Sequence, residues 1–563
     1  MTGAPTDAAA MLRDAARTRP DTRALIVLDR AGDEVESVTY AELETRVRAA
    51  AAGLAARTVP GSRALLVHPT GVDFVVGFFA CAYAGLIGVP VPYPHAATGG
   101  VERLAGIAKD ADPALILTDA DFAAQRYDLP GEVTVLDPAA TAPAHWQPVP
   151  VDPDTPLFLQ YTSGSTSAPK GAVITHGNVV ANFTEVADVL DADRVDFTVV
   201  SWLPLYHDMG LGQVLSAIRS AGTAVLIPPA AFLMRPAVWP EAVSRYRGYV
   251  SSAPNFAYDL CAARTPAATI AGLDLSGWRW LLNGAEPVRH DTFTRFAAAF
   301  APAGFSPDGF MPSYGLAEGT LYVSGRRAPG PLRHVDLDAE ALERGTLTPA
   351  GAGPARRIVS CGAPARNLAV VIADPQTGAV LGADAIGEIC VAGPSVAHGY
   401  WQQPEATAAR FGHRVAGSTH DHLRTGDLGF FRDGELYVLG RADDLIIVDG
   451  RNIFPQDVER TVDACHPDLA PGRSAAFGLD RSGETVLGIA VETARGAASG
   501  GELDQQTRAE LVAAVRRRVV EEHQVPVGAV ILLRPGGLPR TTSGKVQRRP
   551  TRARYLDGTL KTW

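Results

Sequence analysis

The chain has 563 residues, too many for one ordinary hydrophobic core, so at least two domains are expected. Hydrophobic residues make up 46% of it and charged residues 20%, which is typical of a soluble globular protein. The formal net charge of -10 argues against a nucleic-acid surface as its main function, and we expect no nucleic-acid partner.

The cysteines and the first residues favour a reducing, cytoplasmic location. The five cysteines are scattered, and no pair has metal-ligand spacing or suggests a disulfide framework. The start, Met-Thr-Gly-Ala-Pro-Thr-Asp, lacks the basic residues and the apolar core of a signal peptide.

One uncharged run, residues 74–94, is long enough to raise the possibility of a membrane-spanning helix. Pro90, Pro92 and Pro94 interrupt its second half. We therefore expect a buried helix over about 74–84, then a buried strand over 86–91, and no membrane insertion.

Apolar strand-like runs alternate with helical patterns in the first 150 residues. A helix is expected to begin at a capping box formed by Thr39 and Glu42. The expected strands are 24–28, 64–67, 86–91, 114–118 and 133–136. This alternation predicts α/β layers with largely parallel sheets.

A loop dense in hydroxyls and glycine, residues 161–171, lies between apolar runs at 156–160 and 172–176. Its glycine lets backbone N–H groups turn inward, its hydroxyls donate hydrogen bonds, and Lys170 adds a charge, so it can wrap a polyphosphate. It is not a Walker loop, because Pro169 and Gly171 flank the lysine. A Ser/Thr/Gly-rich loop alone is more often a linker, but the flanking strands and the Pro-Lys-Gly ending favour phosphate binding.

Further polar residues lie where strands are expected to end. His207 follows a strand at 198–203, the end at which α/β proteins bind ligands. Tyr314 can stack on a base, Glu318 can hold Mg²⁺, and Asp427 can accept hydrogen bonds from a sugar diol. Each residue alone is more often structural.

The last third of the chain changes character twice. Residues 326–357 have Arg, Pro and Gly at both ends around a short acidic helix expected at 336–344. Strands then resume, with a hairpin turn at Asp433-Gly434. Beyond 441–443 the pattern indicates a small separate α/β unit. Its basic tail, 538–549, is either a solvated loop or the carrier of one functional lysine, Lys545.

Five segments in this order resemble the adenylate-forming superfamily, which includes acyl-CoA synthetases, peptide-synthetase adenylation domains and luciferases. They are 162–171, 314–318, 424–427, 440–444 and 542–545. Within the superfamily the chain is most similar to the fatty acyl-AMP ligases. The segments that carry this second similarity are 203–210, 254–260, 282–287, 393–397 and 450–457. Two positions depart from the pattern: Gly319 stands where Ala is expected, and Asp443 is often Lys in acyl-AMP ligases.

The resemblance implies a two-domain fold. Residues 1–441 are expected to form a large N-terminal domain with several subdomains, layered and mostly parallel sheets, and a β-rich third subdomain. Residues 442–563 are expected to form a small mobile α+β domain with its hinge at Asp443. In the family, an insertion corresponding to about 326–357 restrains the small domain and disfavours free CoA.

The activity that the resemblance implies is ATP-dependent activation of a fatty or related carboxylic acid. The products would be an acyl-adenylate and pyrophosphate, and the acyl group would then pass to the phosphopantetheine thiol of an acyl carrier protein. An acyl-CoA synthetase and a non-catalytic nucleotide- or lipid-binding module remain the alternatives.

Site residues carry over from the family one by one. Lys545, His207 and Glu318 are the expected catalytic residues, with Glu318 as the Mg²⁺ ligand. The expected ATP and AMP contacts are Thr162, Ser163, Gly164, Ser165, Thr166, Lys170, Asn283, Gly284, Ala285, Ser313, Tyr314, Gly315, Asp427 and Arg441. The expected acyl pocket comprises Trp202, Ser251, Asn255, Phe256 and Tyr258.

Overall fold

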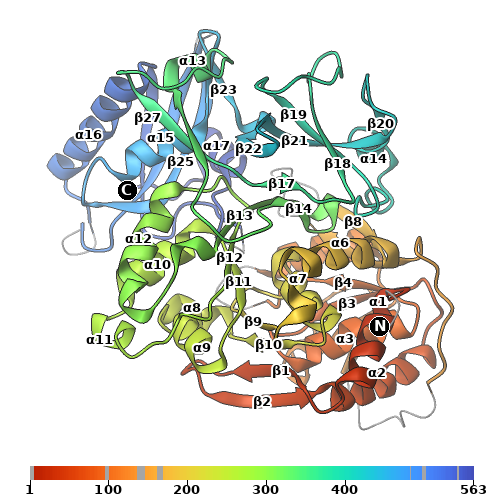
Figure 1. The fold of residues 1–563 in the computed structure, drawn as a ribbon. Helices are drawn as coiled ribbons and strands as arrows, with labels where there is room; N and C mark the ends of the chain where they lie inside the picture. Colours follow the sequence, from red (N-terminus) through yellow and green to blue (C-terminus); the bar gives the residue numbers. More distant parts are fainter. Residues whose placement is uncertain are drawn as a thin grey trace.

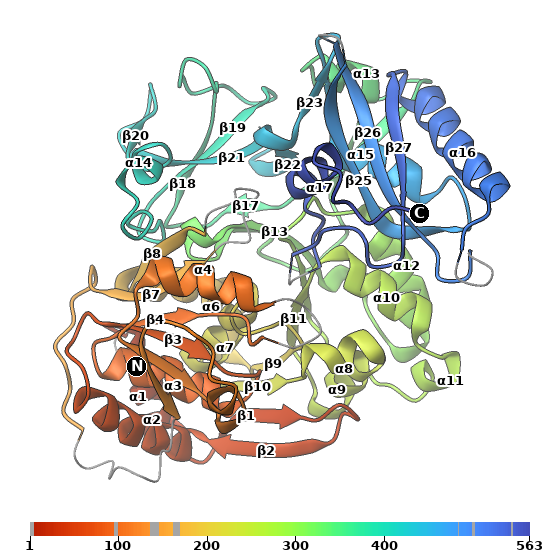
Figure 2. The ribbon, with the colours of Figure 1, turned by 180° about the vertical axis from the view of Figure 1, so that it is seen from behind.

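The computed structural model describes residues 5–94, 100–135, 146–161, 169–481, 484–497, 502–541 and 544–563. Figure 1 shows a large lower body that runs from red to green, a β-rich part in teal above it, and a blue C-terminal lobe beside that part. The view from behind shows the C-terminal lobe resting over the green part of the large body (Figure 2).

Two sheets with largely parallel strands form the large body, as predicted. The first has nine strands in the order β17-β14-β13-β12-β11-β9-β10-β1-β2, parallel from β1 to β13. Its strands are β1 (Arg23–Leu28), β2 (Glu34–Thr39), β9 (Thr198–Ser201), β10 (Thr223–Leu226), β11 (Val250–Ala253), β12 (Trp280–Asn283), β13 (Phe310–Gly315), β14 (Tyr322–Gly325) and β17 (Ala363–Pro364).

The second sheet has six strands in the order β6-β5-β3-β4-β7-β8, of which only the β7–β8 pair is antiparallel. Its strands are β3 (Arg63–Val67), β4 (Ile87–Pro90), β5 (Leu115–Thr118), β6 (Glu132–Val135), β7 (Pro156–Tyr161) and β8 (Gly171–Thr175). The hydroxyl-rich loop thus connects two paired antiparallel strands, as its flanking sequence predicts.

Helices pack between and around these sheets. They are α1 (Ala8–Thr18), α2 (Tyr40–Ala55), α3 (Val72–Tyr83), α4 (Gly100–Ala111), α5 (Ala120–Ala124), α6 (His176–Val189), α7 (Asp208–Arg219), α8 (Pro229–Met234), α9 (Val238–Tyr246), α10 (Asn255–Arg264), α11 (Ala267–Ile270) and α12 (His290–Phe300). Helix α2 begins at the predicted capping box of Thr39 and Glu42.

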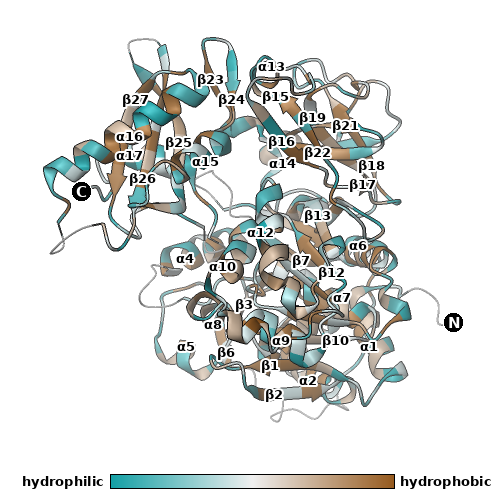
Figure 3. Ribbon diagram, turned by 60° about the vertical axis from the view of Figure 1, so that its left-hand side comes forward, coloured by the Kyte–Doolittle hydropathy of each residue, from teal (hydrophilic) through white to brown (hydrophobic). Residues whose placement is uncertain are grey.

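The uncharged run at 74–94 forms α3 and β4 inside the protein. Every residue of α3 except Asp73 is buried, in keeping with a helix that is apolar on all sides. In Figure 3 the brown colour of hydrophobic residues marks strands of the large body such as β1. Across the described ranges, we find no helix whose length and apolarity would let it cross a membrane.

The β-rich part is an antiparallel five-stranded sheet. It contains β18 (Ala369–Ala373), β19 (Gly387–Ala392), β20 (His413–Arg414), β21 (Asp421–Arg432) and β22 (Glu435–Arg441), with the short helix α14 (Pro404–Ala408) beside it. The predicted turn at Asp433-Gly434 joins β21 to β22.

Residues of the expected insertion form an antiparallel pair, β15 (His334–Asp338) and β16 (Ala355–Val359), around helix α13 (Ala339–Glu343). Asp336–Asp338 therefore belong to a strand, so the acidic helix is shorter than predicted. The pair contacts the C-terminal lobe through Arg356, whose Nε lies 3.0 Å from Asp457 Oδ2. Arg451 of that lobe pairs with Glu343 at the end of α13.

The C-terminal lobe is built on a three-stranded sheet, β25-β26-β27. Its elements are β23 (Ile446–Val448), β24 (Arg451–Ile453), α15 (Pro455–Asp463), β25 (Leu469–Arg481), β26 (Glu484–Thr493), α16 (Gln505–His523), β27 (Val527–Leu533) and α17 (Arg548–Leu556). The sequence predicted no helix at α17, because its apolar residues are too few to form a periodic stripe. The boundary at 441/442 and the mobility of the lobe stay predictions.

Arg548, at the start of α17, ties the lobe together. Its guanidinium lies 2.9 Å from Asp444 and 2.7 Å from Glu459, and the Glu459 side chain is only 8% exposed. Burial alone would lower the pKa of Arg548, but the two carboxylates outweigh burial and raise it. The basic tail is thus partly a buried ion-pair partner and not only a solvated surface.

We predict that Arg548→Met destabilises the C-terminal lobe by about 3–5 kcal/mol, because it leaves the buried Glu459 without a counter-charge. Calorimetry of the full chain should show the transition of this lobe shifted to lower temperature. Arg17→Met is the control: Arg17 and its partner Asp14 are both exposed, so its effect should stay within about 0.5 kcal/mol. Equal stability of the two variants would contradict the structural role of Arg548.

Candidate functional site

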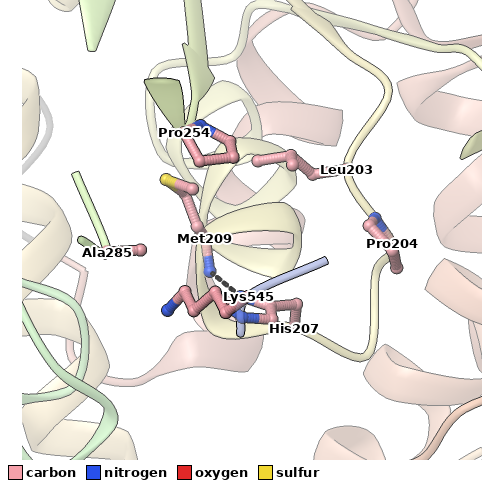
Figure 4. Close-up of a pocket in the computed structure, with 7 residues that line it drawn as sticks. All are labelled: Leu203, Pro204, His207, Met209, Pro254, Ala285 and Lys545. Carbon is pink, nitrogen blue, oxygen red and sulfur yellow. Dashed lines mark hydrogen bonds between the residues drawn. The ribbon is translucent and has the colours of Figure 1, made fainter. Parts of the chain in front are cut away.

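A pocket lies where strands of the nine-stranded sheet end and the C-terminal lobe meets the large body. Figure 4 shows its lining: Leu203, Pro204, His207, Met209, Pro254, Ala285 and Lys545. Six of these residues follow β9, β11 and β12, and Lys545 comes from the C-terminal lobe. The structure thus brings together His207 and Lys545, which are 338 positions apart in the numbering.

His207 is the residue that precedes α7, and its ring is held by the next residue. His207 Nδ1 lies 2.5 Å from Asp208 Oδ1. The Met209 N–H is 2.7 Å from that oxygen and 3.4 Å from His207 Nδ1, so it bonds to the carboxylate. Nδ1 therefore carries the proton that faces Asp208, and Nε2 is left for other partners.

The charge environment keeps Asp208 ionised. Burial would raise the pKa of this carboxyl, but His207, Lys545 and the Met209 amide outweigh burial and lower it to about 2. Asp208 thus contacts the His207 ring and is also influenced by the charge of Lys545, so two pocket residues act on one carboxylate. From the sequence, Asp208 is expected with Tyr206 and His207 at the end of the strand at 198–203, but the sequence assigned it no role of its own.

Gln160 is a second residue that the sequence did not reveal. It lies in β7, is 3% exposed, and its Nε2 donates to the carbonyl of Tyr206 at 3.0 Å. This bond connects the strand that leads into the hydroxyl-rich loop with the segment that carries His207. No local sequence signal indicates a contact between residues so far apart.

The residues predicted to contact adenine lie at the ends of β12 and β13. Asn283 is fully buried, and neither atom of its amide has a hydrogen-bond partner in the part of the chain that the structure describes. The backbone of Gly284 lies so close to β13 that a Cβ at this position would be 2.8 Å from the Ser313 carbonyl oxygen. Ala285 has a φ of +68°, an unfavourable conformation for a residue with a side chain.

Tyr314, Asp427 and Arg441 also meet. The Tyr314 hydroxyl donates to Asp427 Oδ2 at 2.7 Å, and Arg441 Nε is 4.0 Å from Asp427 Oδ1. Burial raises the pKa of Asp427 above its ordinary value, against the opposing effect of Arg441. One carboxylate oxygen is held by the phenol, and the other faces a cation. The predicted base-stacking residue is thus also tied to the predicted ribose ligand.

Glu318 and Lys170 lie on either side of Tyr400, which the sequence did not single out. The Tyr400 hydroxyl donates to Glu318 Oε1 at 2.7 Å. Lys170 Nζ lies 5.4 Å from the centre of the Tyr400 ring. The phosphate-loop residues Thr162, Ser163, Gly164, Ser165 and Thr166 lie outside the described residues.

The predicted acyl-pocket residues lie beside the pocket in an aromatic cluster. Trp202 stacks on Phe232 with ring centres 4.0 Å apart and meets Phe256 edge to face at 5.9 Å. Ser251 and Tyr258 are fully buried and donate to main-chain carbonyls. The remaining member, Asn255, bonds through its side chain to Glu286 and to neighbouring backbone groups. Ring packing and hydrogen bonds thus hold the predicted acyl-pocket residues in place.

Asp443, the predicted hinge, has cationic groups from both bodies beside it. Its Oδ2 is 3.8 Å from Arg410 of the β-rich part and 3.4 Å from Arg549 of α17. The residue is about half exposed on its side chain, so these pairs contribute little to stability. Its role as a hinge stays a prediction.

The residues present fit ATP and a magnesium ion. The unpartnered Asn283 amide can both donate to and accept from a base, and a buried amide without partners otherwise costs stability. Glu318 offers one carboxylate oxygen that Tyr400 does not engage. No group of three or more His, Cys, Asp or Glu residues that could hold a metal occurs within the described part of the chain. A single carboxylate is what Mg²⁺ uses when substrate phosphates complete its coordination.

Known proteins are similar to this chain in sequence and in fold. The family described as "AMP-binding enzyme" matches residues 12–401, and the one described as "Disco-interacting protein 2-like, AMP domain" matches residues 443–563. The medium-chain-fatty-acid–acyl-carrier-protein ligase JamA of Moorena producens is 38% identical, covering 94% of this chain and 92% of JamA. The long-chain-fatty-acid–AMP ligase FadD26 of Mycobacterium marinum is 36% identical, covering 97% and 96%.

Solved structures agree with the sequences. A chain from a study of fatty acyl-adenylate ligases from E. coli and L. pneumophila has a TM-score of 0.87 at 32% identity, covering 98% of each chain. An L. pneumophila fatty acyl-adenylate ligase in complex with acyl adenylate and pyrophosphate has a TM-score of 0.76 at 34% identity, covering 99% of this chain and 97% of that one. The chain has the adenylate-forming fold and belongs to the AMP-binding enzyme family.

Proposed function

We propose that this enzyme, a fatty acyl-AMP ligase, activates a fatty or related carboxylic acid with ATP and then passes the acyl group to the phosphopantetheine thiol of an acyl carrier protein. The observation that carries the proposal is the meeting of His207 and Lys545 in one pocket, whose lining includes Ala285, two residues after the buried Asn283. The names of the similar ligases, one of which includes an acyl carrier protein, support it.

In the first step a carboxylate oxygen of the acid forms a bond to the α-phosphorus of ATP. The bond from that phosphorus to the α–β bridging oxygen breaks, and pyrophosphate leaves with the electron pair. Both reactants are anions, so the site must neutralise charge and hold them in line. Lys545 would lie between the acid and the α-phosphate, and His207 Nε2 would face the acid.

The nucleotide would be held on the other side of the pocket. Asn283 would bond the base, the Asp427 carboxylate would accept hydrogen bonds from the ribose hydroxyls, and Lys170 with residues 162–166 would contact the β- and γ-phosphates. A magnesium ion held by Glu318 would supply charge neutralisation on the phosphate oxygens.

In the second step a thiol sulfur attacks the acyl carbonyl carbon, the bond to AMP breaks, and the thiol proton is lost. The lobe that carries Lys545 must turn away for a thiol to reach that carbon, and Asp443 is the proposed hinge. The ion pairs of Arg356 with Asp457 and of Arg451 with Glu343, which join the insertion to the lobe, favour the orientation seen here. An acyl-CoA synthetase remains the alternative for this step only.

We expect Lys545→Ala to lower the rate of acyl-adenylate formation by about 100-fold or more, because it removes a charge that acts where charge develops. ATP affinity should stay within about twofold, since Lys545 faces the reacting centre and not the base or ribose. Hydroxamate trapping of the adenylate and calorimetric ATP titration measure the two quantities. Lys561→Ala is the control, because Lys561 is an exposed lysine of the same lobe. If Lys545→Ala forms the acyl-adenylate as fast as Lys561→Ala does, the proposed role of Lys545 is refuted.

Asp427→Ala should weaken ATP binding about ten- to a hundredfold, because a charged hydrogen-bond acceptor is lost in a buried place. Asp421→Ala is matched to it, since Asp421 lies on the same strand β21 but its side chain is 53% exposed. Binding is measured by isothermal titration of ATP to the full chain. Unchanged ATP affinity of Asp427→Ala would remove this residue from the ribose site.

The acceptor is tested by supplying the enzyme with ATP, a panel of fatty acids, and either CoA or a phosphopantetheinylated acyl carrier protein. We expect acyl carrier protein to be loaded and acyl-CoA to stay near background. Mass spectrometry of both products decides between them. Abundant acyl-CoA would favour the CoA ligase, and pyrophosphate release that does not depend on the acid would contradict both ligase assignments.

A further inference from the structure

The segment 397–403, between β19 and α14, is fastened to the strand that follows the phosphate loop. The Trp401 N–H donates to the Gly171 carbonyl at 2.8 Å, and the Val173 N–H donates to the Gly399 carbonyl at 2.9 Å. Through these bonds, segment 397–403 pairs with the edge of β8 that is opposite β7. The end of the phosphate loop is therefore attached to chain that lies more than 200 positions further on.

The same segment is also fastened to the Glu318 region and to the loop itself. The Ala397 N–H donates to the Glu318 carbonyl at 2.9 Å. Gln403 Nε2 donates to the Pro169 carbonyl at 3.0 Å, directly before Lys170. One short stretch thus fixes the distance between the lysine of the phosphate loop and the carboxylate proposed to hold the metal ion.

Tyr400 lies in the middle of this stretch, and its side chain contacts both charged residues. Its hydroxyl donates to Glu318 Oε1 at 2.7 Å, and its ring is 5.4 Å from Lys170 Nζ. Its own N–H donates to Thr407 Oγ1 at 2.9 Å, and its side chain meets Phe411 edge to face. The residue is only 9% exposed, so its packing holds both ends of the side chain in place.

We propose that Tyr400 is a positioning residue for the triphosphate, in which the hydroxyl orients Glu318 toward the metal ion and the ring orients Lys170 toward the phosphates. This deepens the proposed function and rests on it. A hydrogen bond that occupies Oε1 leaves Oε2 for the ion, and such bonds to ligating carboxylates commonly change metal affinity tenfold or more. An ammonium over an aromatic face is attracted to it and loses part of its freedom.

Two substitutions separate the hydroxyl from the ring. Tyr400→Phe removes only the bond to Glu318, so Mn²⁺ binding to the enzyme with a non-hydrolysable ATP analogue should weaken by about tenfold. Binding of pyrophosphate without metal should stay within twofold. Tyr400→Leu removes the ring as well, so both should weaken. Electron paramagnetic resonance of free Mn²⁺ and calorimetric titration of pyrophosphate measure the two affinities without any turnover.

Tyr246→Phe is the matched control, because it removes another tyrosine–glutamate hydrogen bond, Tyr246 to Glu34 at 3.2 Å, between α9 and β2. It should leave both affinities unchanged. Glu318→Gln is the reference for loss of the metal ligand. Wild-type Mn²⁺ affinity in Tyr400→Phe together with loss in Glu318→Gln would overturn the role of Tyr400 and leave the metal assignment standing.

Wild-type Mn²⁺ affinity in Glu318→Gln would instead refute the metal assignment in the proposed function, and the hydroxyl role of Tyr400 with it. Unchanged pyrophosphate affinity in Tyr400→Leu would overturn the role of the ring. If the leucine variant fails to fold, as judged by near-ultraviolet circular dichroism, the phenylalanine variant still decides the role of the hydroxyl.

Discussion

Two anions have to meet in this enzyme, and the arrangement of the molecule follows from that constraint. A carboxylate and a polyphosphate repel each other, so cations must be brought to both sides of the point where they react. In the proposed mechanism the large body supplies Lys170, the C-terminal lobe supplies Lys545, and His207 faces the acid. Because Lys545 lowers the pKa of Asp208, the lobe's charge already acts inside the pocket in the orientation described. The site exists in full only while the two bodies are in contact.

Arginine ion pairs join the insertion to the C-terminal lobe, with Arg356 of the insertion on Asp457 and Arg451 of the lobe on Glu343. Arg356 is 8% exposed, lies 3.0 Å from Asp457 and stacks over Phe454, so its pair is screened little by solvent. Burial lowers the pKa of Arg356, and Asp457 acts in the opposite direction. Loss of the contact with Asp457 would leave a buried guanidinium without its counter-charge, which is strongly destabilising. The exposed pairs around Asp443 are weak by comparison. The proposed turning of the lobe would therefore break the ion pairs of the insertion, and the exposed pairs at Asp443 would resist it little.

Much of this fold follows from local sequence rules, and the site follows from them only in part. Apolar runs and a capping box predicted β1, α2, α3 and β4, because burial and helix capping act over a few neighbouring residues. Tyr400, Gln160 and Arg548 could not be found that way. Each makes its important bond with a residue far away in the chain, and a tyrosine, a glutamine or an arginine has no local pattern that reveals its partner. The residues alone placed His207 at a strand end and Lys545 in a basic tail, but only the resemblance of whole motifs to a family gave them specific roles, and no periodicity places them in one pocket.

Two features on the proposed nucleotide side of the pocket lower the stability of the folded protein. The Asn283 amide is buried with no partner among the described residues, and Ala285 is held at a φ of +68°. Each feature costs on the order of 1–3 kcal/mol in a folded chain. In the proposed function a base would supply these hydrogen bonds, so its binding would recover part of that free energy and stabilise the folded state by mass action. The same polar groups that lower stability would make the proposed site selective, because a ligand without matching donors and acceptors would leave them unpaired.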